Sequence, residues 1–322
     1  MGQSDDIEKL LKLRTEMNVW STFDRANLDF YETTFRRLDA VSKDILEIGS
    51  GYGFTSFFFA LSGARRVSGL EFIPEAFHKS IELKDSLYPE LPVYFQYGDA
   101  SKELPFPDES FDCLTLIEVI SHVICEDMHS FFTEMARVLR PGGLLFISDG
   151  NNGRSPRRRR INRTVWNRFE NGPPTAEGET VDGHHVSISY VEVRRRAAQR
   201  TVNGLSSEEY NRIALGTSFY SEHEVECATL KYSQTGEFPQ SFYNKNSCPV
   251  DPAQSIYMEK LFDPISLRRM LREIGFTVDL ITTRRKLPIQ SAWDAVPYFT
   301  MLLANGFVML ARKKPYAESA PR

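Results

Sequence analysis

The chain has 322 residues and an ordinary globular composition, with 41% hydrophobic residues, 25% charged residues and a formal net charge of −4. This length corresponds to about two domains or one enlarged domain, and the composition excludes collagen, a coiled-coil rod and a disordered tail protein. The net negative charge argues against a polycation built to bind DNA.

The first residues argue against a targeting signal, because residues 1–13 are acidic where a secretory signal is basic. No run approaches the roughly 18 apolar residues that cross a bilayer. The four cysteines form no CxxC pair, which argues against a disulfide framework and a thiolate metal site. We therefore expect a cytoplasmic protein with no membrane contact and no metal.

Residues 7–40 have the apolar spacing of one or two amphipathic helices, and from residue 44 strands and helices alternate. Helices are predicted at 55–63, 74–88 and 128–139. Strands are predicted at 44–48, 65–72, 93–99, 111–119 and 144–150. Strands separated by helices indicate a parallel sheet that is covered on both faces.

The alternation stops at residues 150–262, which are rich in Gly, Asn, Pro and Arg and have few clear periods. It resumes with a helix at 264–275 and strands at 276–283 and 306–314. We therefore predict four parts. They are an N-terminal helical cap (1–43), an α/β core (44–150), an insertion that covers the acceptor (151–262) and a C-terminal return to the core (263–322).

A glycine-rich segment lies between the first strand and the first helix. Gly49, Gly51 and Gly53 allow a tight turn and a close approach of ligand to backbone at a helix N-terminus. A dinucleotide-binding loop would have its third glycine at position 54, which is Phe54 here. Glu47 precedes the first glycine by two positions, where a carboxylate favours a cationic ligand over a pyrophosphate.

This segment resembles the first motif, acidic-x-G-x-G-x-G, of the class I S-adenosylmethionine-dependent methyltransferases, and in particular the type 11-like methyltransferase domain. The resemblance covers 44–150, including the blocks LPFPDESFDCLTLIEVISHV and LRPGGLLFISD, and resumes at 263–314. It implies an α/β fold with a Rossmann-like doubly wound sheet, mostly parallel with an antiparallel last strand, and a large insertion after strand five. It also implies S-adenosylmethionine as the cofactor.

The resemblance assigns a set of residues at the strand ends to this cofactor. Glu71 would bind the ribose hydroxyls, and Asp99 with Ala100 would contact adenine. The full set is Glu47, Gly49, Ser50, Gly51, Gly53, Glu71, Phe72, Asp99, Ala100 and Glu118. Two alternatives stay open, since the glycines could serve only to turn the chain and Glu118 could be a capping residue.

An acceptor that holds a proton at neutral pH, as an alcohol does, needs a base during methyl transfer. His122 follows the fourth strand in EVISHV and has a side chain suited to proton abstraction. Asp149, at the end of strand five, could orient such a base or bind the acceptor. His122 could equally pack against or cap the following helix.

The predicted insertion is strongly basic at its start, with eleven arginines and five acidic residues in 151–200. Arginine binds phosphate and carboxylate in fork geometry, and aromatic residues lie nearby. The predicted acceptor-binding residues are Arg154, Arg157, Arg158, Trp166, His184 and His185. A solvated basic face, or a contact in a homodimer, is the alternative, and the run Arg194–Arg196 is expected on a helix surface.

The leading hypothesis is therefore methyl transfer to a small-molecule or saccharide acceptor, at oxygen and with an anionic group on the acceptor. An RNA methyltransferase that uses the arginines for phosphates is a second hypothesis. The overall acidity and the lack of a recognisable RNA-binding module count against nucleic acid. The third is a non-catalytic S-adenosylmethionine-binding scaffold protein.

Overall fold

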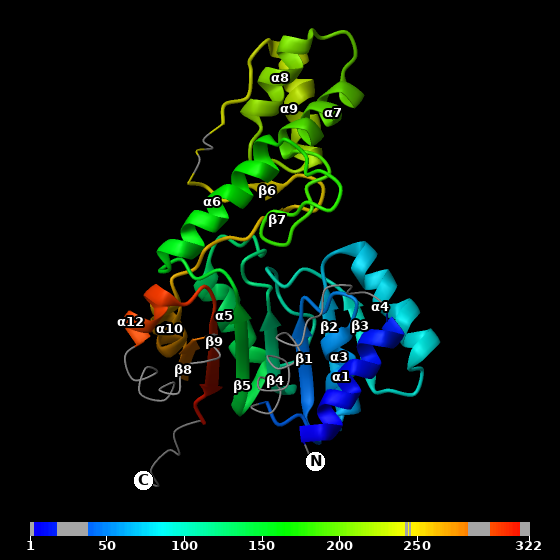
Figure 1. Ribbon diagram of the computed structural model, residues 1–322, viewed down its shortest axis with the longest axis vertical. Coiled ribbons are helices and arrows are strands. Elements are labelled where there is room, and N and C mark those ends of the chain that lie inside the picture. The colour runs from blue at the N-terminus through cyan, green and yellow to red at the C-terminus, as the bar shows by residue number, and fades with distance from the viewer. Residues whose placement is uncertain (1–2, 18–37, 242–243, 245, 283–296, 316–322) are drawn as a thin grey trace.

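A computed structural model describes residues 3–17, 38–241, 244, 246–282 and 297–315. The main strands are β1 (Asp44–Ile48), β2 (Arg66–Glu71), β3 (Val93–Tyr97), β4 (Phe111–Ile117), β5 (Leu139–Asp149), β8 (Phe276–Thr282) and β9 (Phe307–Lys313). They form one sheet in the order β3-β2-β1-β4-β5-β9-β8 (Figure 1). Strands β1 to β5 are parallel, and β9 is antiparallel to β5 and β8. The predicted Rossmann-like sheet with an antiparallel last strand is confirmed.

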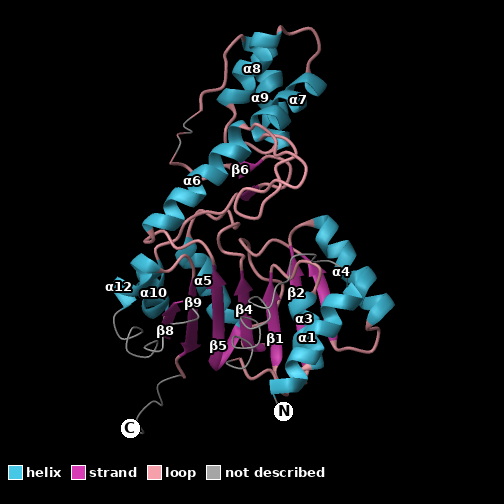
Figure 2. Ribbon diagram, viewed as in Figure 1, coloured by secondary structure: helices cyan, strands magenta, loops and turns pink. Residues whose placement is uncertain are grey.

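Helices cover both faces of this sheet (Figure 2). One face carries α1 (Gln3–Met17), α3 (Phe54–Leu61) and α4 (Pro74–Leu87), and the other carries α5 (Met128–Val138), α10 (Pro264–Ile274) and α12 (Pro297–Leu303). Asp127 and Asp263 cap α5 and α10 with their side chains, and Gly275 ends α10 in the left-handed region. Of the helical segment predicted at 7–40, residues 18–37 lie outside the described part of the chain. None of the described helices combines the length and the apolar character needed to cross a membrane.

The sequence between β5 and α10 is more regular than expected. It forms α6 (Pro156–Asn171), α7 (Tyr190–Thr201), α8 (Ser207–Gly216), α9 (Glu222–Thr235) and a small hairpin, β6 (Val250–Asp251) and β7 (Ile256–Tyr257). Ser206 and Ser221 open α8 and α9 with capping boxes completed by Glu209 and Glu224. The expectation of few periodic elements is wrong here, and these elements extend away from the sheet in Figure 1.

Arg194 does not lie on the helix surface where it was predicted. Its side chain is 0% exposed, and that of its partner Glu170 is 2% exposed. The guanidinium donates to both carboxylate oxygens of Glu170, and its Nε donates to the carbonyl oxygen of Ala214 at 2.9 Å. Because an unpaired charge is costly in a protein interior, this ion pair fastens α6, α7 and α8 together.

Candidate active site

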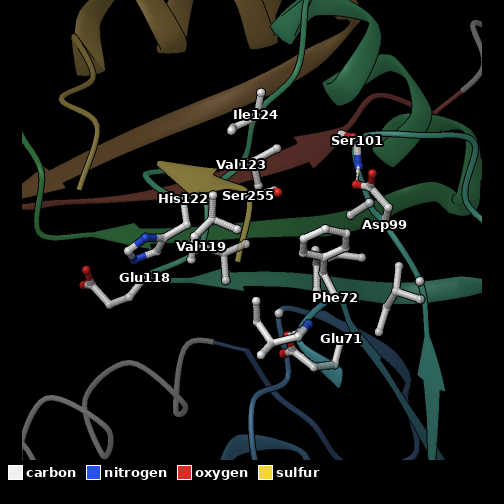
Figure 3. A pocket seen from close by; sticks show the side chains of 17 residues that line it. Glu71, Phe72, Asp99, Ser101, Glu118, Val119, His122, Val123, Ile124 and Ser255 are labelled. Atoms are coloured by element: carbon white, nitrogen blue, oxygen red, sulfur yellow. Dashed lines mark hydrogen bonds between the residues drawn. The ribbon is translucent and has the colours of Figure 1, made fainter. Parts of the chain in front are cut away.

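A cavity of about 220 Å³ lies beside the carboxyl ends of β1, β2, β3 and β4 (Figure 3). The predicted site residues that line it are Gly49, Glu71, Phe72, Asp99, Ala100, Glu118 and His122. Ser255 and Ile256, from the hairpin β6–β7, form a further part of the wall. The cavity therefore has the position that ligands take in open α/β sheets, and the chain between β5 and α10 contributes to it.

The glycine loop has a backbone that other residues rarely adopt. Gly49, Gly51 and Gly53 have φ angles of 66°, 53° and 87°. A Cβ atom on Gly49 would lie 2.5 Å from Cγ2 of Val119, and one on Gly53 would lie 2.4 Å from Cζ of Phe95. No described atom lies within 4 Å of a Cβ placed on Gly51. The loop thus excludes side chains at 49 and 53 and leaves open space at 51.

Glu71 joins β2 to this loop. The side chain is buried, and its Oε2 accepts a hydrogen bond from the backbone N–H of Gly51 at 2.7 Å. Its Oε1 accepts one from the N–H of Ile73, also at 2.7 Å. An ionised carboxylate has about four acceptor positions, so each oxygen can accept one more hydrogen bond from a ligand in the cavity.

Four of the predicted cofactor residues do not line the cavity. They are Glu47, Ser50, Gly51 and Gly53. Glu47 is buried between β1 and α3, where it accepts a hydrogen bond from the hydroxyl of Ser56, and burial raises the pKa of Glu47 to about 8. A direct contact of Glu47 with a ligand stays a prediction.

Glu118 lines the cavity at the end of β4 and has a positive φ of 53°. Its Oε2 accepts a hydrogen bond at 2.9 Å from the N–H of Gly150, which follows β5. Glu118 thus satisfies a backbone N–H beyond the neighbouring strand end while it also faces the cavity, and its contact with the cofactor stays a prediction.

His122 is held by β7 and the residues that directly follow it. Its Nδ1 lies 2.8 Å from the carbonyl oxygen of Tyr257, and a carbonyl only accepts, so Nδ1 carries the proton. Two backbone hydrogen bonds run alongside, from Tyr257 to His122 at 2.9 Å and from Lys260 to Ser121 at 2.8 Å. The alternative that His122 caps the following helix does not hold, since Asp127 caps α5.

Glu259 was not singled out from the sequence, yet it joins His122, His184 and Arg158. Its side chain is 13% exposed, and its Oε1 lies 3.9 Å from Nε2 of His122 and 3.4 Å from Nε2 of His184. Its Oε2 accepts hydrogen bonds from Nδ2 of Asn151 and, at 3.3 Å, from Arg158. Burial raises the pKa of Glu259, but the hydrogen bond from His184 and the nearby His122 outweigh it and lower that pKa to about 2.

Asp149 is fully buried and does not line the cavity. Its carboxylate accepts hydrogen bonds from the backbone N–H groups of Ser121 at 3.2 Å and Asn151 at 2.8 Å. Burial raises the pKa of Asp149. Asp149 therefore connects the loop after β4, which carries His122, to the end of β5.

The three predicted acceptor-binding arginines do not line the cavity. Arg154 pairs with Asp263 at 3.3 Å, Arg158 pairs with Asp182 as well as Glu259, and Arg157 is exposed on α6. Guanidinium groups that are already paired with carboxylates are poorly placed to bind an anionic acceptor.

The three remaining predicted acceptor residues, Trp166, His184 and His185, do not line the cavity either. The buried indole of Trp166 donates to the carbonyl oxygen of Glu259 at 3.2 Å, so it supports the backbone of that residue. His185 is exposed, and its Nδ1 lies 2.7 Å from the hydroxyl of Thr175. Of the adjacent histidines, only His184 reaches the Glu259 carboxylate among the described contacts.

Comparison with known proteins places the central part of the chain in a family. Residues 46–147 match the family model described as a methyltransferase domain. The chain is 33% identical over 107 residues to 2-methyl-6-phytyl-1,4-hydroquinone methyltransferase of Synechocystis, covering 33% of this chain and 32% of that protein. It is 31% identical over 126 residues to a fatty-acid O-methyltransferase of Mycolicibacterium smegmatis, covering 39% of this chain and 43% of that protein. The chain thus spans less than half the length of these curated relatives.

Solved structures include an S-adenosylmethionine-dependent methyltransferase from Mesorhizobium loti, with a TM-score of 0.45 and 15% identity over 88% of this chain and 97% of that one. The family match falls on β1 to β5, with the glycine loop after β1. Residues 46–147 therefore match a methyltransferase domain, and this match together with the named relatives indicates S-adenosylmethionine as the cofactor.

Proposed function

We propose that the chain transfers the methyl group of S-adenosylmethionine to an oxygen atom of a small-molecule acceptor. The observation that carries this proposal is the cavity, in which the glycine loop, Glu71, Asp99 and His122 meet at the ends of adjacent strands. A relative named as a fatty-acid O-methyltransferase supports oxygen as the methylated atom.

The cavity residues fit the cofactor. Both oxygens of Glu71 retain capacity for the two ribose hydroxyls, and Gly49 brings the backbone of the glycine loop to the cavity wall. Leu70, Ile73 and Ala100 supply apolar walls for a purine ring next to Asp99. When bound, the cofactor supplies a methyl group that its positively charged sulfur makes easy to displace.

His122 is the proposed base. Orientation of the two reactants contributes most to such a displacement, with up to roughly 7–11 kcal/mol available from proximity. An alcohol must also lose its proton, and the Nδ1–H bond to the Tyr257 carbonyl leaves the lone pair of Nε2 available for it. We expect His122→Ala to lower turnover about 10²–10⁴-fold while affinity for S-adenosylmethionine stays close to that of the wild type.

A neutral or apolar acceptor fits the described walls better than an anionic one. Val119, Val123 and Ile256 line the cavity, and no arginine does among the described residues. The arginines invoked for phosphate contacts, in a saccharide phosphate or in RNA, include Arg154 and Arg158, which are paired with carboxylates. Within the predicted division of the chain into four parts, we propose that residues 151–262 determine the specificity for the acceptor.

Transfer of a labelled methyl group tests this proposal directly. The full chain is incubated with [methyl-¹³C]S-adenosylmethionine and, separately, with organic and aqueous extracts of the source cell. We expect a labelled product from the organic extract, with the carbon chemical shift of a methoxy group. Label in an N-methyl product, or only in RNA, would contradict the proposal, and binding of the cofactor with no label transfer would favour a scaffold protein.

A further inference from the structure

Glu259 lies at a point where three separate stretches of chain converge on one carboxylate. His122 comes from the loop after β4, His184 from the turn before α7, and Asn151 with Arg158 from the end of β5 and from α6. The backbone of Glu259 is also fixed, because its carbonyl oxygen accepts hydrogen bonds from Asn162 at 2.7 Å and from Trp166. Its φ of 62° is unusual for a residue other than glycine.

The two imidazoles meet this carboxylate in opposite protonation patterns. Nδ1 of His122 donates to the Tyr257 carbonyl, so Nε2 of the neutral ring carries no proton. At 3.9 Å that Nε2 is too far from Glu259 for a direct hydrogen bond. Nε2 of His184 lies 3.4 Å from the same Oε1 and donates to it. His184 therefore satisfies the oxygen, while the negative charge remains close to His122.

We propose that Glu259 is a positioning residue that acts through His122, because its negative charge stabilises the imidazole electrostatically when the ring takes a proton from the acceptor. This proposal rests on the proposed function, in which the acceptor is an alcohol. In the proton transfer, the acceptor O–H bond would break and an N–H bond would form at Nε2 of His122. The acceptor oxygen would bond to the methyl carbon of S-adenosylmethionine as the carbon–sulfur bond breaks, with its electron pair left on sulfur, so that the cofactor leaves as the neutral thioether. Glu259 stays an anion throughout, and the imidazolium loses its proton to solvent after the product forms.

Other charged groups around His122 do not replace Glu259 in this role. Glu118 lines the same cavity but accepts from the N–H of Gly150, and Asp149 is buried and bonded to two backbone N–H groups. The guanidinium of Arg158 is shared between Asp182, Asn151 and Glu259. The ammonium of the neighbouring Lys260 lies over the ring of Tyr257, 4.5 Å from its centre.

Histidine NMR on the full chain tests the proposal without any acceptor. The chain contains six histidines, so the ring signals of His122 can be assigned in ¹⁵N-histidine-labelled protein with a His122→Gln variant. In Glu259→Gln we expect the titration midpoint of His122 to fall by about one to three pH units, because the nearby negative charge is removed. In Glu259→Asp, which keeps the charge, we expect a smaller fall. Asp182→Asn is the matched control, since it removes another carboxylate bound by Arg158 and should leave the midpoint unchanged.

An unchanged His122 midpoint in a folded Glu259→Gln variant would overturn the proposal. If Glu259→Gln does not fold, the midpoint in Glu259→Asp decides, and a wild-type value there overturns it too. Once an acceptor is known, the rise of turnover with pH should move to lower pH in Glu259→Gln, together with a lower kcat and an unchanged KM for S-adenosylmethionine. Failure to find any acceptor would count against the proposed function but would leave the NMR result standing on its own.

Discussion

Replacement of Glu71 by Gln is the sharpest test of how the cavity binds its cofactor. The two carboxylate oxygens of Glu71 accept hydrogen bonds from the backbone N–H groups of Gly51 and Ile73. A glutamine has a single acceptor oxygen, so its NH₂ group must face one of these two donors. A buried donor left without a partner costs about 1–3 kcal/mol, and a lost hydrogen bond to a ribose hydroxyl costs a similar amount.

We therefore expect Glu71→Gln to weaken binding of S-adenosylmethionine by roughly 5- to 150-fold, measured by titration calorimetry on folded protein. Glu75→Gln, on the exposed first turn of α4, is the matched control and should bind as the wild type does. A 2′-deoxy analogue of S-adenosylhomocysteine separates the two causes. The analogue lacks one ribose hydroxyl, so loss of the ribose contact in Glu71→Gln should lower its affinity less than that of S-adenosylhomocysteine. Unchanged affinity in folded Glu71→Gln would refute the placement of the ribose at the end of β2.

Three further predictions concern the buried charges and the glycine loop. Burial raises the pKa of Glu47 from 4.5 to about 8 in the folded chain. Between these two pH values the folded state binds more protons than the unfolded state, so the free energy of unfolding should fall as the pH rises from about 4.5 to 8. Glu47→Gln should flatten that fall in urea titrations at pH 5 and 8.5, and an equally steep fall would contradict the burial argument. Arg194→Ala should destabilise the fold by about 3–5 kcal/mol, because it leaves Glu170 charged and buried, and Arg194→Ala with Glu170→Gln should recover part of that loss in thermal unfolding. NADH should not displace S-adenosylmethionine, because Phe54 stands where a dinucleotide loop needs glycine, and competitive displacement in calorimetry would count against the site.

The sheet could be predicted because strands that are buried on both faces have short apolar sequences, and here these sequences lie between helices. β4, for example, is almost wholly buried, and every predicted strand from 44 to 150 overlaps an observed one. Apart from the helix expected at Arg194–Arg196, the helices of 151–262 were not predicted, and in α6 and α7 the many arginines hide the apolar period. Arg194 shows the same difficulty, since no local pattern distinguishes an arginine that will pair with a buried glutamate from one exposed to solvent.

Most of the predicted cofactor residues line the cavity and none of the predicted acceptor-binding residues does, for a physical reason. Glu71 ends β2 and Asp99 lies two residues after β3, and parallel strands bring their carboxyl ends to one edge. Glu259 reaches His122 only through tertiary contacts, in a segment with no motif of its own. The polar residues after β5, which include Asn151, were a sequence feature that could have pointed to this cluster, because polar side chains at this edge of the sheet bind a ligand or another polar side chain.

The difference between the two parts of the site also explains why similarity to the relatives does not identify the acceptor. The family match ends at residue 147, whereas Ser255, Ile256 and Glu259 all lie beyond it. This segment both lines the cavity and binds His122 through the Tyr257 carbonyl, so on the proposed function it would couple acceptor binding to the placement of the base. On the proposed function, substitutions in that segment would change which acceptor is methylated while the predicted cofactor residues between β1 and β5 stay the same. We infer that similarity confined to 46–147 carries information on the cofactor and very little on the acceptor.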